Sequence, residues 1–97
     1  MTASQLAPRL FAAGSEEIRL GLIGCGGRGT GAVLNAMEMS NVRLVALGDV
    51  FRQSVDRTLN RVKKEKPQAL DVPASRQFTG LSAFEGVLKS NLDLVIL

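Results

Sequence analysis

A glycine-rich segment that directly follows an apolar run constrains the fold of this chain more than any other feature. The run is Ile18–Ile23, and Gly24, Gly26 and Gly29 after it fit the pattern G-x-G-x-x-G. A nearly continuous apolar run is typical of a parallel strand that is covered on both faces. Between a strand and a helix, this glycine pattern is typical of a turn that binds the phosphates of a dinucleotide. The sequence therefore predicts a strand, a tight turn and a helix here.

Each of the three glycines has its own physical reason. Gly24 permits a tight turn in which a Cβ atom would be strained. Gly26 lets the backbone approach a pyrophosphate, and Gly29 lets the helix pack closely against the sheet. The pyrophosphate would then meet free N–H groups at the positive end of the helix dipole.

An acid follows at the distance that the pattern requires. Asp49 ends a second apolar run, Val42–Leu47, about 20 residues after the glycines. Its carboxylate can accept hydrogen bonds from a ribose diol and would repel a 2′-phosphate, so NAD is favoured over NADP; Arg52 nearby weakens this preference. The candidate cofactor-binding residues are Gly24, Cys25, Gly26, Gly27, Arg28, Gly29, Asp49 and Val50.

The remaining periodicity extends the same alternation of strands and helices. Apolar residues at helical spacing predict two helices and their core faces, and Ser82 with Glu85 fits a capping box that starts a third helix. Gly31 weakens the first turn of the first predicted helix, which is tolerable if a ligand or the sheet needs close approach there. The predicted helices are 28–39 (core face Val33, Ala36, Met37), 51–66 (Val55, Leu59, Val62) and 83–90 (Ala83, Phe84, Val87, Leu88), and the further strands are 76–79 and 92–97, with a loop at 68–75.

The order β-α-β-α-β-α-β predicts an α/β fold, a Rossmann-like doubly wound parallel sheet that is incomplete. We expect residues 18–97 to be part of a nucleotide-binding domain that belongs to a longer protein. Residues 1–17 are predicted to be an N-terminal arm, either disordered or the end of an export leader, since Ala12 and Ala13 precede polar residues. The compartment, cytoplasmic or periplasmic, stays open.

Composition excludes several kinds of chemistry. The 97 residues include no His and one Cys, so the chain cannot form a Ser-His-Asp triad, a Cys-rich zinc site or an internal disulfide. The net charge of +3 does not indicate nucleic-acid binding, and the basic residues of 61–66 are read as a solvated helix face. No apolar run reaches the roughly 20 residues of a membrane span. Cys25 is read as a small residue beside the cofactor, not as a nucleophile, because no base accompanies it.

Residues 18–97 resemble the N-terminal domain of the Gfo/Idh/MocA oxidoreductases. The resemblance rests on Ile18–Gly29, on Leu44–Phe51 and on Phe78–Glu85 followed by Leu92–Leu97. It implies NAD(P)-dependent dehydrogenation of a sugar, cyclitol or related hydroxyl compound by a homo-oligomer. In that family the usual catalytic Lys, in a Glu-Lys-Pro motif, lies after the part of the protein that this chain covers, so we predict no catalytic residue in this chain. Some exported members carry a twin-arginine leader whose end resembles Arg9–Gly14, although no twin Arg is present.

Two alternatives remain. S-adenosylmethionine methyltransferases also combine a strand, a Gly-Cys-Gly turn and an acid after the second strand, but they usually place an acid before the glycines, where this chain has Leu22 and Ile23. A non-catalytic nucleotide-binding or sensor protein is the other alternative, because the active-site half is missing.

Overall fold

Four parallel strands form one sheet at the centre of the molecule. In the computed structural model, residues 16–97 are described; the predictions of an N-terminal arm and of a leader end fall almost wholly on residues outside this range. The strands are β1 (Ile18–Ile23), β2 (Val42–Asp49), β3 (Gln77–Thr79) and β4 (Leu94–Ile96). Their order is β3-β2-β1-β4 and every pair is parallel. The chain therefore moves outward from β1 to β3 and then returns to the far side of β1.

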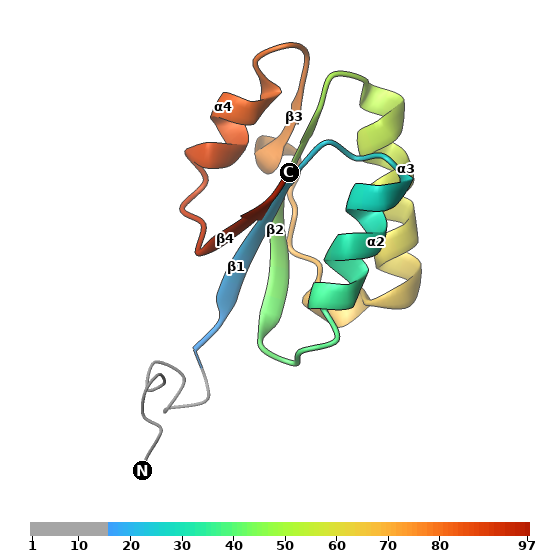
Figure 1. Cartoon of the computed structure of the whole chain (residues 1–97), viewed down its shortest axis with the longest axis vertical. Coiled ribbons are helices and arrows are strands. Elements are labelled where there is room, and N and C mark those ends of the chain that lie inside the picture. Colours follow the sequence, from blue (N-terminus) through green and yellow to red (C-terminus); the bar gives the residue numbers. More distant parts are fainter. Residues whose placement is uncertain (1–15) are drawn as a thin grey trace.

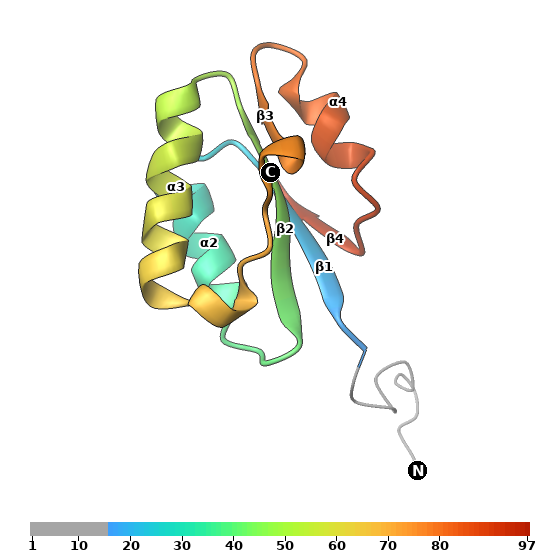
Figure 2. The ribbon, with the colours of Figure 1, turned by 180° about the vertical axis from the view of Figure 1, so that it is seen from behind.

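The helices cover both faces of this sheet (Figures 1 and 2). Helices α2 (Gly27–Ala36) and α3 (Arg52–Glu65) lie side by side on one face, and α4 (Ala83–Leu88) lies on the other. This arrangement confirms the predicted α/β fold with an incomplete Rossmann-like sheet. The carboxyl ends of the parallel strands meet at one edge, which is the upper edge in Figure 1.

The core lies between the sheet and the pair α2 and α3. Leu20, Leu22, Leu44 and Leu47 are fully buried strand residues in this cluster. Helix α3 contributes Val55 and Val62 as predicted, whereas Leu59 is only partly buried and Thr58, at 1% exposure, takes its place. Thr58 is tolerated there because its hydroxyl lies 2.8 Å from that of Thr30 on α2, so neither buried oxygen lacks a partner.

Several predicted element bounds were wrong by two to three residues. Helix α2 ends at Ala36, not Met39, because the chain turns at Met37 to bury that side chain while Met39 stays 57% exposed. Strand β2 continues through Asp49, because Gly48 and Asp49 pair with β3. The final strand shortens to Leu94–Ile96, the part that pairs with β1. The predicted loop at 68–75 holds two 3₁₀ turns, η1 (Pro67–Ala69) and η2 (Ala74–Arg76).

Helix α4 differs most from its prediction. Ala83 and Val87 face the sheet, but Phe84 and Leu88 are 46% and 55% exposed, so the predicted core face is only half correct. Two strand glycines explain the close fit, because a Cβ at Gly48 would lie 2.6 Å from Val87 and one at Gly21 would lie 3.0 Å from it. The predicted capping box does not form: Ser82 occupies the N-cap position without a side-chain hydrogen bond.

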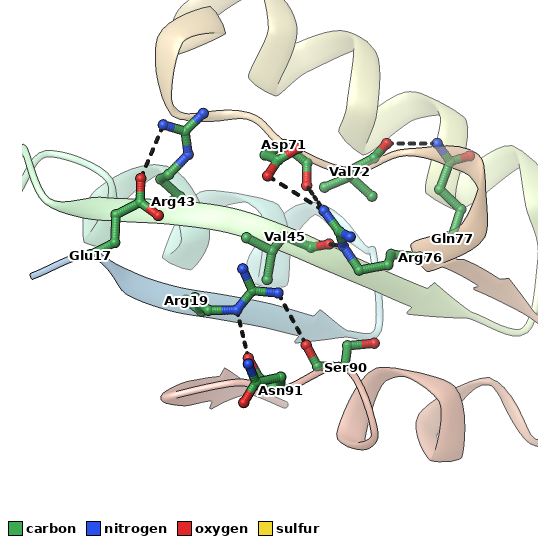
Figure 3. Close-up of polar contacts among 10 residues, drawn as sticks. All are labelled: Glu17, Arg19, Arg43, Val45, Asp71, Val72, Arg76, Gln77, Ser90 and Asn91. Carbon is green, nitrogen blue, oxygen red and sulfur yellow. Dashed lines mark hydrogen bonds and ion pairs between the residues drawn. The ribbon is translucent and has the colours of Figure 1, made fainter.

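Arginine side chains satisfy carbonyl groups that the short outer strands leave free (Figure 3). Arg76 Nε donates to the carbonyl of Val45 in β2 at 2.7 Å, below the point where β3 begins. On the other side of the sheet, Arg19 in β1 donates through Nε and Nη2 to the carbonyls of Asn91 and Ser90. The bond to Val45 also matters because its residue is buried, and a buried carbonyl without a partner is costly. Together these bonds tie the loops before β3 and β4 to the sheet.

Candidate functional site

The turn after β1 has the geometry that its glycines predict. Gly24 has a φ of +95°, a conformation that residues with a Cβ rarely adopt. Its N–H donates to the carbonyl of Gly48 at 2.8 Å, which ties the turn to the end of β2. A Cβ at Gly29 would lie 2.4 Å from the carbonyl oxygen of Gly24. The predicted roles of Gly24 in the turn and of Gly29 in helix packing are both confirmed.

The start of α2 is open. A Cβ added at Gly26 or Gly27 would meet no other atom within 4 Å, so neither glycine is required by packing inside the described structure. The same holds for Gly31, so the sheet does not need close approach at that position. No side chain caps the helix at Gly26, and its first turn holds no acid. The N–H groups of the first turn thus lack intrahelical acceptors and can bind an anion.

The Asp49 side chain joins the glycine turn after β1 to the turn between β2 and α3. Its Oδ1 accepts a hydrogen bond from the N–H of Cys25 at 2.8 Å, and its Oδ2 accepts one from the N–H of Phe51 at 2.9 Å. Sequence reasoning placed Asp49 at the ribose but missed this structural role. The signal for it is an Asp two residues before the N-cap residue Phe51 of α3, where its side chain can accept the N–H of the second residue on. The carboxylate can still accept a hydrogen bond from a ligand hydroxyl.

The Asp49 carboxyl remains ionised well into the acidic range. Partial burial raises its pKa, but the hydrogen bonds from the Phe51 and Cys25 N–H groups outweigh this effect. A hydrogen bond from the Ser54 side chain and the positive charge of Arg57 add to them, so the pKa of Asp49 lies below its ordinary value.

The cation whose charge acts on Asp49 is Arg57, not Arg52 as the sequence indicated. Arg52 is held by the carboxylate of Asp56 and the side-chain oxygen of Gln77. Arg57, one turn further along α3, is the residue whose charge acts on Asp49. The exposed side chain of Arg28 adds a further cation at the start of α2, where the helix dipole itself favours an anion.

Two hollows flank the glycine turn. The larger, about 570 Å³, lies between the start of α2 and the middle of α3 and includes Cys25, Gly26 and Gly27 in its lining. The smaller, about 160 Å³, lies at the carboxyl ends of β1 and β2, with Asp49 and Val50 in its lining. Sequence reasoning missed the apolar wall of the smaller hollow. That wall is formed by Leu81, Ala83 and Phe84.

Cys25 contributes its backbone, not its thiol, to this site. The side chain is 2% exposed, and Sγ donates to the carbonyl of Gly48 at 3.6 Å. Desolvation raises the pKa of the thiol to about 11, although a hydrogen bond with Thr58 opposes the shift. A thiol in this state is protonated near neutral pH and is a poor nucleophile.

We therefore expect Cys25 to resist modification in the folded chain. A thiol reagent at pH 8 should react at least tenfold more slowly than with the unfolded chain, because the folded thiol is buried and protonated. Since the unfolded thiol ionises first, stability should fall as pH rises from about 9 to about 11, by up to about 3 kcal/mol. Denaturant melts across this range measure the effect. Reaction at the unfolded rate would contradict the buried placement.

Among residues 16–97, no three His, Cys, Asp or Glu side chains come together as metal ligands would. No helix in the same range is long and apolar enough to cross a bilayer.

The fold and the turn define a class of protein: an α/β protein whose parallel sheet has the strand order of the first part of a Rossmann-like fold. No family model matches the chain, and no curated protein matches it.

Proposed function

We propose that residues 18–97 bind the adenosine diphosphate part of a nicotinamide dinucleotide, with NAD preferred over NADP. One observation carries this proposal: the open start of α2 and the Asp49 carboxylate lie at the same glycine turn. That turn is at the carboxyl edge of a parallel sheet. In open α/β sheets ligands bind at this edge, near the point where the strand order reverses, here between β1 and β4.

Each candidate residue has a role in this proposal. The N–H groups from Gly27 to Gly29 bind the pyrophosphate, and the Arg28 side chain adds positive charge beside it. Gly26 leaves room for the phosphates. Gly24 and the Cys25 backbone hold the turn against Asp49, whose remaining lone pairs accept the ribose hydroxyls. Val50 lies in the lining of the smaller hollow, which is apolar enough for an adenine ring.

The proposed reaction class follows from the resemblance to the Gfo/Idh/MocA oxidoreductases. The nicotinamide would exchange a hydride with a sugar, a cyclitol or a related hydroxyl compound. On the same resemblance, residues 18–97 would hold the cofactor, and the catalytic groups would belong to another part of a longer, homo-oligomeric protein.

A valine at Gly26 gives the sharpest test of cofactor binding. Gly26 has φ −82° and ψ −178°, an extended conformation that valine readily adopts, and the added side chain meets no protein atom at its Cβ. We expect Gly26→Val to fold with a stability within about 1 kcal/mol of the native chain. Its branched side chain would fill the space of the pyrophosphate, so affinity for NAD should fall at least tenfold.

Isothermal titration with NAD, NADP and S-adenosylmethionine measures this effect, and Gly31→Ala on the same helix is the control. NAD binding that survives in Gly26→Val would overturn the proposed placement of the pyrophosphate. Saturable binding of S-adenosylmethionine with none of NAD would favour the methyltransferase alternative. Tight NAD binding by a full-length protein without dehydrogenase activity would favour the sensor alternative.

A further inference from the structure

The larger hollow reaches Gly26 and Gly27 of the glycine turn, and it also carries a cluster of positive charge on α3 to which the proposed dinucleotide binding assigns no role. Helices α2 and α3 lie side by side on one face of the sheet (Figure 2), and the cleft of about 570 Å³ opens between them. Arg57, Arg61 and Lys64 of α3 lie in its lining. They occupy positions i, i+4 and i+7, so they share one face of the helix.

Only one acid offsets these cations within the cleft. Glu65 also lies in the lining, and its Oε2 pairs with Arg61 Nε at 3.0 Å. Arg57 donates instead to the neutral hydroxyl of Ser54 at 3.2 Å. No ion pair to Lys64 is found among residues 16–97. The lining therefore holds two more positive than negative charges, although the charge of Arg57 also acts on the Asp49 carboxylate outside the cleft.

Helix stability does not account for this arrangement. Cations in the last turn complement the helix dipole, which explains Lys64, but Arg57 lies in the second turn of α3, where the dipole gives no such benefit. Like charges at i,i+4 and i,i+3 also repel one another along the helix. A helix face that only contacts solvent needs no hollow beside it. These side chains instead border a hollow whose lining also includes polar Asn60 and Thr30.

We propose that this cleft is a binding site for a phosphate monoester. Arg57 and Lys64 neutralise the phosphate dianion, Arg57 by paired N–H donors and Lys64 as a point charge. A volume of about 570 Å³ exceeds what a lone phosphate needs and suits a phosphate that carries a small organic group. Two sources share this chemistry: the 2′-phosphate of NADP bound at the turn, and a free phosphorylated compound.

Inorganic phosphate is the first probe. It is titrated into the ¹⁵N-labelled chain at low salt, with chloride at equal ionic strength as the reference. We expect saturable shifts of the amides of Thr30 and of residues 57–64. Lys64→Gln and Arg57→Gln should each weaken phosphate binding about tenfold, the loss expected for one charge-assisted hydrogen bond.

Lys63→Gln is the matched control, because Lys63 lies in the same turn as Lys64 and carries the same charge but is not in the lining of the cleft. Its phosphate affinity should stay within about twofold of the native value. Equal weakening by Lys63→Gln and Lys64→Gln would show a general charge effect and overturn the proposal. The absence of saturable shifts, or shifts confined to the amides of residues 26–29, would also overturn it.

Titration with NADP and NAD separates the two sources. If the chain binds NADP more tightly than NAD, and if Lys64→Gln and Arg57→Gln abolish this difference, the cleft binds the 2′-phosphate. That result would also reverse the expected preference for NAD. Equal affinities together with phosphate binding in the cleft assign it to a free phosphate ester. The cleft borders the turn at Gly26 and Gly27, but the two proposals fail separately: NAD titration of Gly26→Val tests the turn, and inorganic phosphate titration of Lys64→Gln tests the cations of α3.

Discussion

Replacement of Gly29 by alanine is expected to destabilise the fold by about 3 kcal/mol or more. The new Cβ would lie 2.4 Å from the carbonyl oxygen of Gly24 and 3.1 Å from Leu22 Cδ1. A backbone oxygen in a turn that is hydrogen-bonded to Gly48 cannot move aside as a flexible side chain can. Helix α2 would therefore have to separate from β1, which also moves the first-turn N–H groups away from the proposed pyrophosphate position.

Denaturant melts with and without NAD measure this effect. A domain of this size has about 5–15 kcal/mol of stability, so a loss of this size is a large fraction of the total. Gly31→Ala is the matched control on the same helix. Nothing lies within 4 Å of its added Cβ, so alanine there should raise stability by about 0.5–1 kcal/mol. Native-like stability of Gly29→Ala would show that α2 does not pack as closely on β1 as described.

Replacement of Asp49 by asparagine is the second change with a large expected effect. The two carboxylate oxygens accept the N–H groups of Cys25 and Phe51, and an amide can satisfy only one of them while its NH₂ group faces the other donor. We expect a loss of about 2 kcal/mol in the free energy of unfolding. On the proposed function, NAD affinity should fall about tenfold to a hundredfold, because the ribose loses its charged acceptor.

The pH dependence of stability gives this prediction a second readout. Because the pKa of Asp49 is lower in the folded chain, its ionised form contributes stability that is present above the unfolded value of about 3.9 and is lost as pH falls. Asp49→Asn should remove this part of the acid sensitivity. Asp56→Asn serves as the control, since Asp56 forms an exposed ion pair with Arg52 that contributes about 0.5 kcal/mol. Equal effects of the two substitutions would contradict the bridging role of Asp49.

The alternation of strands and helices was predictable because it depends on local pattern. The apolar runs at β1 and β2, the glycine turn and the Val55–Val62 stripe each encode their element within a few neighbouring residues. Element ends were predicted less well, because pairing and packing decide them. Met37 leaves its helix to enter the core, and Gly48 and Asp49 join β2 because β3 lies beside them.

Helix α4 shows why amphipathic spacing was an insufficient guide. Four apolar residues at helical spacing predicted one buried face, yet only Ala83 and Val87 touch the sheet. The contact is set by Gly21 and Gly48 on two different strands, because Val87 fills the space that their missing side chains leave on both. No local pattern in residues 82–90 could indicate that.

The sequence by itself determined the candidate cofactor site, because the three glycines and Asp49 act through backbone conformation and short-range chemistry. Only the tertiary structure decided that Asp49 bridges two turns and that the Cys25 thiol is buried. It also decided that Arg57, not Arg52, acts on that acid, and that three cations of α3 border a cleft. Two of these features join distant parts of the chain: the pairing of β1 with β2 brings Cys25 beside Asp49, and the placement of α2 and α3 side by side on one sheet face forms the cleft.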